Sequence, residues 1–239
     1  MASLEQLLSV CKRHVLKNRT KATVREPYVP YIPAQWNKVL VLAEAQNHAQ
    51  GSYLADLRRM SPRSRLLRLY KSKQMVGVHP WDNGTLKLAV EAALKREASR
   101  TAVSNAVPWS LVKGSKNQTP SPEHLRKSVA FWLDLLPVLQ PELILVAGAK
   151  AEEVVRKVLK SIKIQPKLIP TPLPSPRVLN AVSRTFDEDD LMSRFPEVRK
   201  VIAKRRGWLE IEGHRRNKIL FACLVVSRAS RRGKNLVGL

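Results

Sequence analysis

The chain has 239 residues, 44% of them apolar, and its 43 basic and 19 acidic residues give a formal charge of +24. This charge indicates a polyanionic partner, of which nucleic acid is the commonest. The alternative is a basic, well-solvated surface with no nucleic-acid partner, and an anionic membrane surface is disfavoured because no long basic amphipathic helix with an aromatic face is visible. Two cysteines are too few for a disulfide framework, and no apolar run approaches the roughly 20 residues that span a bilayer, so we expect an intracellular protein with no membrane partner.

The first elements are a helix and a buried strand. Apolar residues at helical spacing predict a helix over 3–17 with Ser3 as its N-cap. A basic, Pro-rich stretch leads into a strand at 38–43, which is apolar from Val39 onward. Residues 52–73 then carry seven cations beside Asp56. This stretch is either a solvated helix face or a phosphate-contacting insertion, and the charge of the whole chain favours the insertion.

Strands and helices alternate through the middle of the chain. After the strand at 38–43, the pattern predicts the following elements in order: a helix over 85–96, a strand at 101–107, a helix that begins at Ser121 and Pro122, a strand at 143–148, a helix over 149–160 and a strand at 167–169. Such alternation implies right-handed crossovers and a parallel sheet with helices on both faces. We therefore expect an α/β fold, a three-layer αβα sandwich around a four-stranded parallel sheet.

The carboxyl-terminal quarter combines a polar helix with an apolar run. Residues 183–206 predict a helix with an acidic start and a basic end, which suits the helix dipole. The run Ile219–Val226 lies between basic residues, and we interpret it as an added edge strand with a basic tail. The expected divisions are an N-terminal helix and entry segment over 1–35, an α/β domain over 36–206 and a basic extension over 207–239.

Polar residues follow three of the predicted strands. They lie in the segments 39–51, 102–105 and 170–177. Parallel strands bring their carboxyl ends to one edge of the sheet, where α/β proteins bind ligands. We expect these three segments to meet there and to form one pocket for a nucleobase.

The residues Asn117-Gln118-Thr119-Pro120-Ser121-Pro122-Glu123, followed by a helix and a strand that ends in Gly148-Ala149-Lys150-Ala151, resemble the uracil-DNA glycosylase superfamily. The iron–sulfur branch of that superfamily reads N-R-T-P-T-P-E-E and then G-A-T-A. The resemblance covers roughly residues 36–182. Three family motifs correspond to Ala43–His48, to Asn105 and to Leu173–Arg177, which are the water-activating motif, the pyrimidine-reading Asn and the H-P-S-P motif with its intercalating residue.

The resemblance implies a DNA glycosylase that flips a deaminated base out of DNA and hydrolyses its N-glycosidic bond. Asn105 would accept a hydrogen bond from N3–H of uracil and donate one to O4. The other implied roles are catalysis by Glu44, Asn47 and His48, base stacking by His79 or Trp81, and DNA backbone contacts by Ser175 and Arg177. The basic stretch at 52–73, by its charge alone, adds Arg58, Arg59, Arg63 and Arg65 as further DNA contacts. Taken without the resemblance, Asn105 would be a capping residue at a strand end, and Glu44 fits an ion pair with an Arg equally well.

Two departures from the family pattern leave other functions open. Ala45 stands where one branch has a water-positioning carboxylate, and Leu173 stands where other branches have a His that donates to the departing base. Catalysis would then be slow, since one lost donor costs about 2.7–4 kcal/mol of barrier. The alternatives are a non-catalytic binder of damaged or single-stranded DNA on the same fold and, from charge alone, a role on RNA.

No cofactor is expected. The cluster cysteines of the iron–sulfur branch correspond to Trp109 and Ser128, and only Cys11 matches at the amino end. Cys11 and His14 form a lone Cys-x-x-His, too few ligands for a metal. We expect a nucleoid-associated monomer whose partner is single- or double-stranded DNA with a damaged base.

Overall fold

The computed structural model describes residues 3–17, 25–28, 30, 32–46, 59–61, 63–64, 67, 81, 83–113, 116–117, 119–174, 179, 187–204 and 215–230. Within them the elements are α1 (Leu4–Arg13), β1 (Val39–Gln46), α5 (Thr85–Leu94), η2 (Ala98–Arg100), β2 (Ala102–Ser110), β3 (Val112–Lys113), β4 (Lys116–Asn117), α6 (Pro122–Leu139), β5 (Leu143–Ala147), α7 (Ala149–Leu159), β6 (Lys167–Thr171), α9 (Glu188–Arg194), α10 (Pro196–Lys204) and α11 (Arg215–Ala229). Among these helices, none is long and apolar enough to cross a bilayer.

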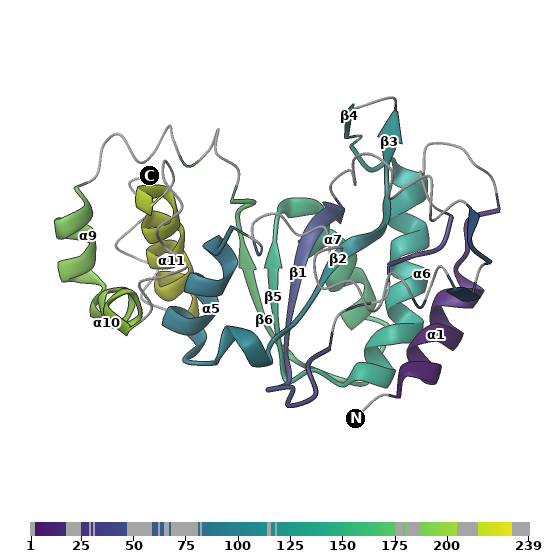
Figure 1. Ribbon diagram of the computed structural model, residues 1–239, viewed down its shortest axis with the longest axis horizontal. Helices are drawn as coiled ribbons and strands as arrows, with labels where there is room; N and C mark the ends of the chain where they lie inside the picture. The colour runs from purple at the N-terminus through teal and green to yellow at the C-terminus, as the bar shows by residue number, and fades with distance from the viewer. Residues whose placement is uncertain are drawn as a thin grey trace.

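The central sheet has four strands in the order β2-β1-β5-β6, and every neighbouring pair is parallel. The four predicted strands form it, and β2 continues three residues past its predicted end, to Ser110. The central strands are apolar over Val39–Ala43 of β1 and over the whole of β5, as expected where helices cover both faces of a parallel sheet. The predicted three-layer α/β fold is thus confirmed (Figure 1).

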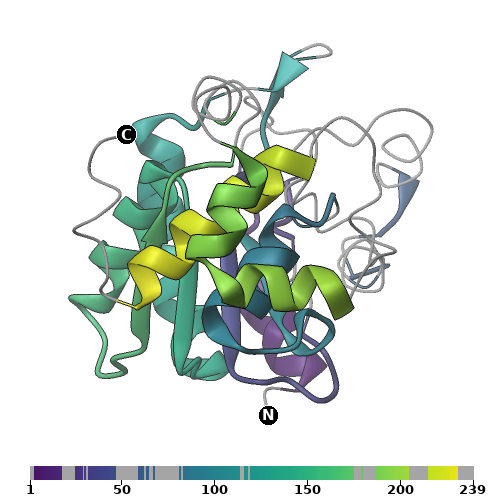
Figure 2. The same ribbon diagram turned by 90° about the vertical axis from the view of Figure 1, so that its left-hand side faces the viewer.

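Two hydrophobic clusters lie on the two faces of the sheet. On one face Leu40, Leu42 and Val146 pack with α1, α6 and α7. On the other, Val41 and Leu145 pack with α5, α9, α10 and α11. Figure 2 shows α9, α10 and α11 in front of the sheet on this second side. Both ends of the described chain therefore belong to the core, since α1 and α11 each contribute fully buried side chains.

The N-caps that the sequence predicts are present. The Ser121 side chain accepts from the backbone N–H of His124, the imidazole of His124 accepts from the Ser121 backbone N–H, and Pro122 follows at the first helical position. Ser3 caps α1 in the same way with Gln6. Each of these reciprocal arrangements is a capping box, which satisfies backbone N–H donors at a helix start that would otherwise lack partners.

Two predictions for the carboxyl-terminal quarter were wrong. The run Ile219–Val226 is the middle of helix α11 and not an edge strand, because a helix that is buried all around has the same continuous apolar sequence as a buried strand. The helix predicted over 183–206 is two helices in its described part, α9 and α10, which are divided at Phe195 by Pro196. Proline cannot continue a helix because it lacks an N–H and clashes with the preceding turn.

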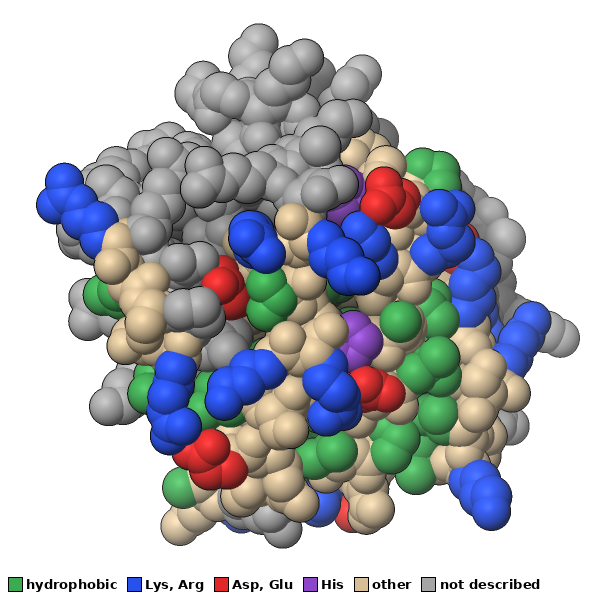
Figure 3. All heavy atoms as spheres, turned by 90° about the vertical axis from the view of Figure 1, so that its right-hand side faces the viewer, with side chains coloured by type: hydrophobic (Ala, Val, Ile, Leu, Met, Phe, Trp, Pro, Cys, Tyr) green, Lys and Arg blue, Asp and Glu red, His purple; other side chains and the backbone are tan. Residues whose placement is uncertain are grey.

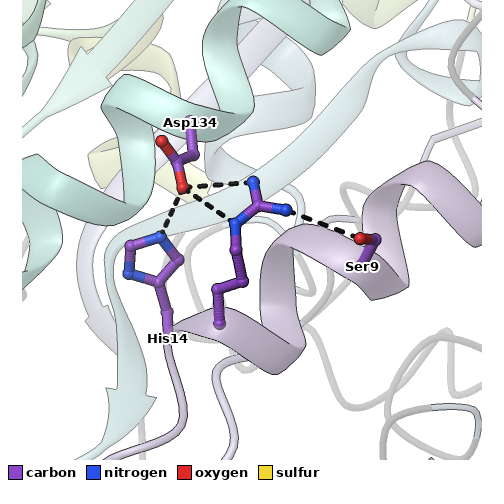
Figure 4. A network of polar contacts seen from close by, with 4 residues as sticks. Ser9, His14 and Asp134 are labelled. Carbon is purple, nitrogen blue, oxygen red and sulfur yellow. Dashed lines mark hydrogen bonds and ion pairs between the residues drawn. The ribbon is translucent and has the colours of Figure 1, made fainter.

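A polar network joins α1 to α6 at the surface (Figure 4). Oδ2 of Asp134 accepts hydrogen bonds from Nη2 of Arg13 at 3.1 Å and contacts Nε2 of His14 at 3.0 Å. Burial works to raise the pKa of the Asp134 carboxyl, but the hydrogen bonds from His14 and Arg13 outweigh it, so the pKa lies below its ordinary value. The His14 ring also meets Phe131 edge to face, with 5.6 Å between centroids, which ties this network to the core.

The two cysteines lie in different layers. Cys11 belongs to the cluster under α1, α6 and α7, and Cys223 to the cluster under α5 and α11. Both thiols are free and buried, and burial raises the pKa of each to about 12. Neither thiol is therefore ionised near neutral pH, and the sheet separates one from the other.

Candidate functional site

The last residues of β5 and β6 form one row with Ala43 of β1 and Asn105 of β2, two strands that continue beyond this row to Gln46 and Ser110. Asn105 of β2 is in register with Ala43 of β1, Ala43 with Ala147 of β5, and Ala147 with Thr171 of β6. Paired residues of parallel strands project to the same side, so these four lie on the α5 side of the sheet. The register thereby brings the described parts of the three predicted polar segments to one edge.

Glu44 follows Ala43 and lies against the turn between β5 and α7. A Cβ atom built on Gly148 would be 2.7 Å from Oε2 of Glu44 and 3.4 Å from its Cβ. Gly148 has φ +107° and ψ 149°, a conformation that is nearly restricted to glycine. Its N–H donates to the carbonyl of Thr171 at 3.0 Å, which joins the turn to β6. Glycine at this position leaves the room that the half-buried Glu44 carboxylate occupies.

Asn105 is almost wholly buried, with 1% of its surface exposed. Trp81, the stacking candidate within the described residues, precedes α5 and packs against the hydrophobic cluster on the same side of the sheet. The ring of Trp81 is half-buried, and Nζ of Lys87 lies 5.9 Å from its centroid. Asn105 and Trp81 thus share a side of the sheet, near the carboxyl ends of its strands.

The end of β6 is anchored from two directions. The Thr171 hydroxyl donates to the carbonyl of Val146 at 3.1 Å, and Nη1 of Arg228, from the last turn of α11, donates to the carbonyl of Pro170 at 2.9 Å. Leu173 follows between two prolines and is 38% exposed, the largest exposure of any bulky apolar side chain in the described part of the chain. Leu173 therefore places an apolar side chain at the carboxyl edge, at the position where other branches of the family that the chain resembles have a His.

Several predicted site residues lie outside the described residues: Asn47, His48, Arg58, Arg65, His79, Ser175 and Arg177. Arg59 is described and exposed. Arg63 is exposed too, and its Nη2 lies 3.3 Å from Oε1 of Glu5 in α1. The Arg63 charge is thus partly offset within the protein.

Three features at this edge escaped the sequence predictions. Gly148 could have been found from its place directly after a buried strand, where a positive φ is common. The two-stranded hairpin of β3 and β4, which follows β2, pairs Lys113 with Lys116 in register. Arg228 carries no sequence signal, because its position depends on how α11 packs.

The donor set does not fit a four-cysteine iron–sulfur cluster. Such a cluster needs about four thiolates, whereas the chain has two cysteines on opposite sides of the sheet. Trp109 and Ser128, at the corresponding positions, are buried, and the Trp109 ring packs edge-on against Phe131 with 6.2 Å between centroids. Among the residues that the structure describes, no group of three or more His, Cys, Asp or Glu side chains is placed to hold a metal ion.

These features define an α/β protein whose polar residues gather at the carboxyl edge of a parallel sheet covered on both faces, where proteins of this class bind ligands. A family model for the uracil DNA glycosylase superfamily matches residues 29–195. The chain therefore belongs to the uracil-DNA glycosylase superfamily, whose members act on DNA. No curated protein matches the chain. The family match ends before α10 and α11.

Proposed function

We propose that this protein is a DNA glycosylase that flips a deaminated base, uracil or a related one, out of DNA and hydrolyses its N-glycosidic bond. The observation that carries the proposal is the position of Asn105, buried at the carboxyl edge in register with β1 and within the superfamily match. A buried carboxamide offers one acceptor and two donors, which suit the N3–H and O4 of uracil and oppose the reversed pattern of cytosine.

The reaction breaks the bond between C1′ of the sugar and the base nitrogen, and the bonding electron pair leaves with the base. Water then adds to C1′ and loses a proton, which the departing base takes up. Among the described residues, Glu44 suits two roles at the sugar. Its carboxylate can act as a base toward the attacking water, or its negative charge can stabilise the sugar cation. Asn47 and His48 complete the proposed catalytic set.

Other residues are assigned to holding DNA. Trp81 or His79 stacks on the extruded base, and Ser175 and Arg177 hold the strand beside the gap. The remaining DNA contacts are assigned to Arg58, Arg59, Arg63 and Arg65. We further propose that the protein works without a cofactor, inside the cell and as a monomer.

The test is base release from oligonucleotides that contain one uracil, hypoxanthine or xanthine, single-stranded and paired. The expected result is an alkali-sensitive site at the modified base, with undamaged oligonucleotide as the control. Intact strands after alkali with all three bases in both forms would refute the glycosylase proposal.

A second candidate function is binding of damaged or single-stranded DNA without catalysis. It is favoured by Ala45 and by the exposed Leu173, which cannot donate a hydrogen bond to the base. This function predicts salt-sensitive binding with no base release. A burst of released base in the assay above would eliminate it.

A further inference from the structure

At the amino edge of the sheet, opposite the proposed site, the first residues of the four strands lie side by side and are joined by backbone hydrogen bonds. The backbone N–H of Asn37, before β1, donates to the carbonyl of Arg100, before β2, at 2.9 Å. The carbonyl of Lys38 accepts from the N–H of Glu142, before β5, at 2.9 Å, and the carbonyl of Glu142 accepts from the N–H of Lys167 in β6 at 2.9 Å. These bonds hold all four strand starts side by side.

Cations surround this edge. Crossover helices run antiparallel to the strands, so the residues that follow α5 and α7 lie at the same edge. We call the following set the amino-edge cations: Lys38, Lys95, Arg96, Arg100, Lys163 and Lys167. All are exposed except Lys38, which is half-buried with its Nζ 5.0 Å from the Trp36 ring centroid. The acidic residues described near this edge are Glu97, Glu142 and Glu91, whose Oε1 accepts a hydrogen bond from the backbone N–H of Ala98 at 3.2 Å.

The amino-edge cations form no ion pair with the acidic residues of the described chain, whereas several cations on the helices do. Lys127, Arg156 and Lys157 each pair with a glutamate four residues earlier, at 2.7 Å. Accordingly, the face that α1 and α6 present shows Lys and Arg side chains beside Asp and Glu side chains (Figure 3). The amino edge therefore carries six cations, none of which is offset by an ion pair with an acidic side chain of the described chain.

The dimensions of this edge suit a nucleic-acid backbone. Three steps of about 4.8 Å between strands give it a width of about 14 Å. Phosphates follow each other at about 3.4 Å along the axis for one DNA strand, so the edge faces about four of them. Strands of five to nine residues place this edge roughly 17–30 Å from the carboxyl edge.

We propose that the amino-edge cations bind the phosphate backbone of a DNA segment separate from the one held at the carboxyl edge. The contact is independent of sequence and of base damage, because it involves only phosphates. The protein would then hold DNA at two opposite edges of its sheet, one for scanning or retention and one for the base.

The test measures binding to an undamaged duplex over a range of salt concentrations. Lys163→Gln with Lys167→Gln should reduce the slope of log affinity against log salt by about 1.8, since each phosphate contact contributes about 0.9. The control is Lys12→Gln with Lys17→Gln, which removes the same charge from exposed residues at the end of α1 and beyond it. That pair should change the slope by less than half as much.

Equal slopes for the amino-edge variant and the parent protein would overturn the proposal, as would an equal loss in the control. A second readout is single-turnover base release with protein in excess, which should be unchanged in the amino-edge variant. A lower rate of base release in the amino-edge variant would make this edge part of the reaction site, and it would overturn the proposal that the two edges bind separate DNA segments. If the parent releases no base, the proposed function fails, and the binding slopes still decide this inference.

Discussion

The carboxylate of Glu44 occupies space that any side chain at residue 148 would fill, since Oε2 lies 2.7 Å from where a Cβ of Gly148 would be. Gly148→Ala should therefore displace Glu44 and reduce the rate of base release by about 100-fold, the scale of a misplacement of about 1 Å. The positive φ of Gly148 adds backbone strain of about 1–3 kcal/mol, to be measured separately as a lower melting temperature.

The control for Gly148→Ala is the same change in a Glu44→Ala background. If Gly148 acts by leaving room for Glu44, the second substitution should lower the rate little further. An equal fold loss in both backgrounds would assign the whole effect to backbone strain.

Asn105→Ala should remove the proposed readout of the base. Base release should fall by about 100- to 1000-fold, as for loss of one preorganised donor, while affinity for undamaged duplex, which depends on phosphate contacts, should hold. Retention of the parental rate on uracil would contradict the role of Asn105, and equal loss of affinity for undamaged DNA would point to misfolding.

Arg228→Met should loosen the end of β6, because the carbonyl of Pro170 loses a charged donor. A hydrogen bond of this kind contributes about 1.5 kcal/mol to the stability of the anchored β6 end, which is about a tenfold change in the equilibrium constant for anchoring. Base release, which depends on the anchored conformation, should therefore fall about tenfold. Arg199→Met in α10 removes the same charge from an exposed residue and is the matched control. Equal effects of the two substitutions on the rate would show that Arg228 acts only through net charge.

Asp134→Asn should destabilise the contact between α1 and α6 in a pH-dependent way. The folded pKa of Asp134 is lowered, so the ionised carboxylate stabilises the fold above its unfolded pKa of about 3.9. That contribution is lost as the pH falls through the folded value. The variant should melt below the parent at pH 7, and the difference should shrink below about pH 4. A difference that is constant with pH would contradict this assignment.

Helix α11 should be indispensable although it lies beyond the family match. Its large buried apolar side chains are Ile219, Leu220, Phe221, Val225 and Val226. Each contributes about 1.5–3 kcal/mol, so their sum is comparable with the roughly 5–15 kcal/mol that separates folded from unfolded domains. A chain that ends after residue 214 should show no cooperative thermal transition by circular dichroism. A chain that ends after Ser230 is the control, and parental melting of the shorter chain would contradict the prediction.

Much of the fold could be predicted from sequence because local patterns determine it. The apolar run at Val39–Leu42 is short and lies between turn signals, which favours a buried strand over a helix, and Ser121 with Pro122 marks a helix start by capping chemistry. The run at Ile219–Val226 lacks such a signal, since burial on all sides removes the periodicity that distinguishes a helix from a strand. Its conformation depends on α5, which is distant in the sequence.

The candidate site was predictable only in part. Asn105 and Glu44 lie late in the predicted strands or directly after them, so their arrival near one edge follows from parallel topology, although the observed strands β1 and β2 continue past both residues. The contact between Arg228 and Pro170 joins two segments that only the packing of α11 brings together. The room that Gly148 leaves for Glu44 depends on the register of β1 with β5, which no local pattern encodes.

Cys11 and Cys223 give the chain one inert thiol in each hydrophobic layer. Because both are protonated and shielded in the native state, a thiol-specific reagent can react only when the covering helices detach. Pulsed alkylation at increasing denaturant, read by mass spectrometry for each cysteine separately, would therefore report the opening of α1 and of α11 as independent events, without any introduced label.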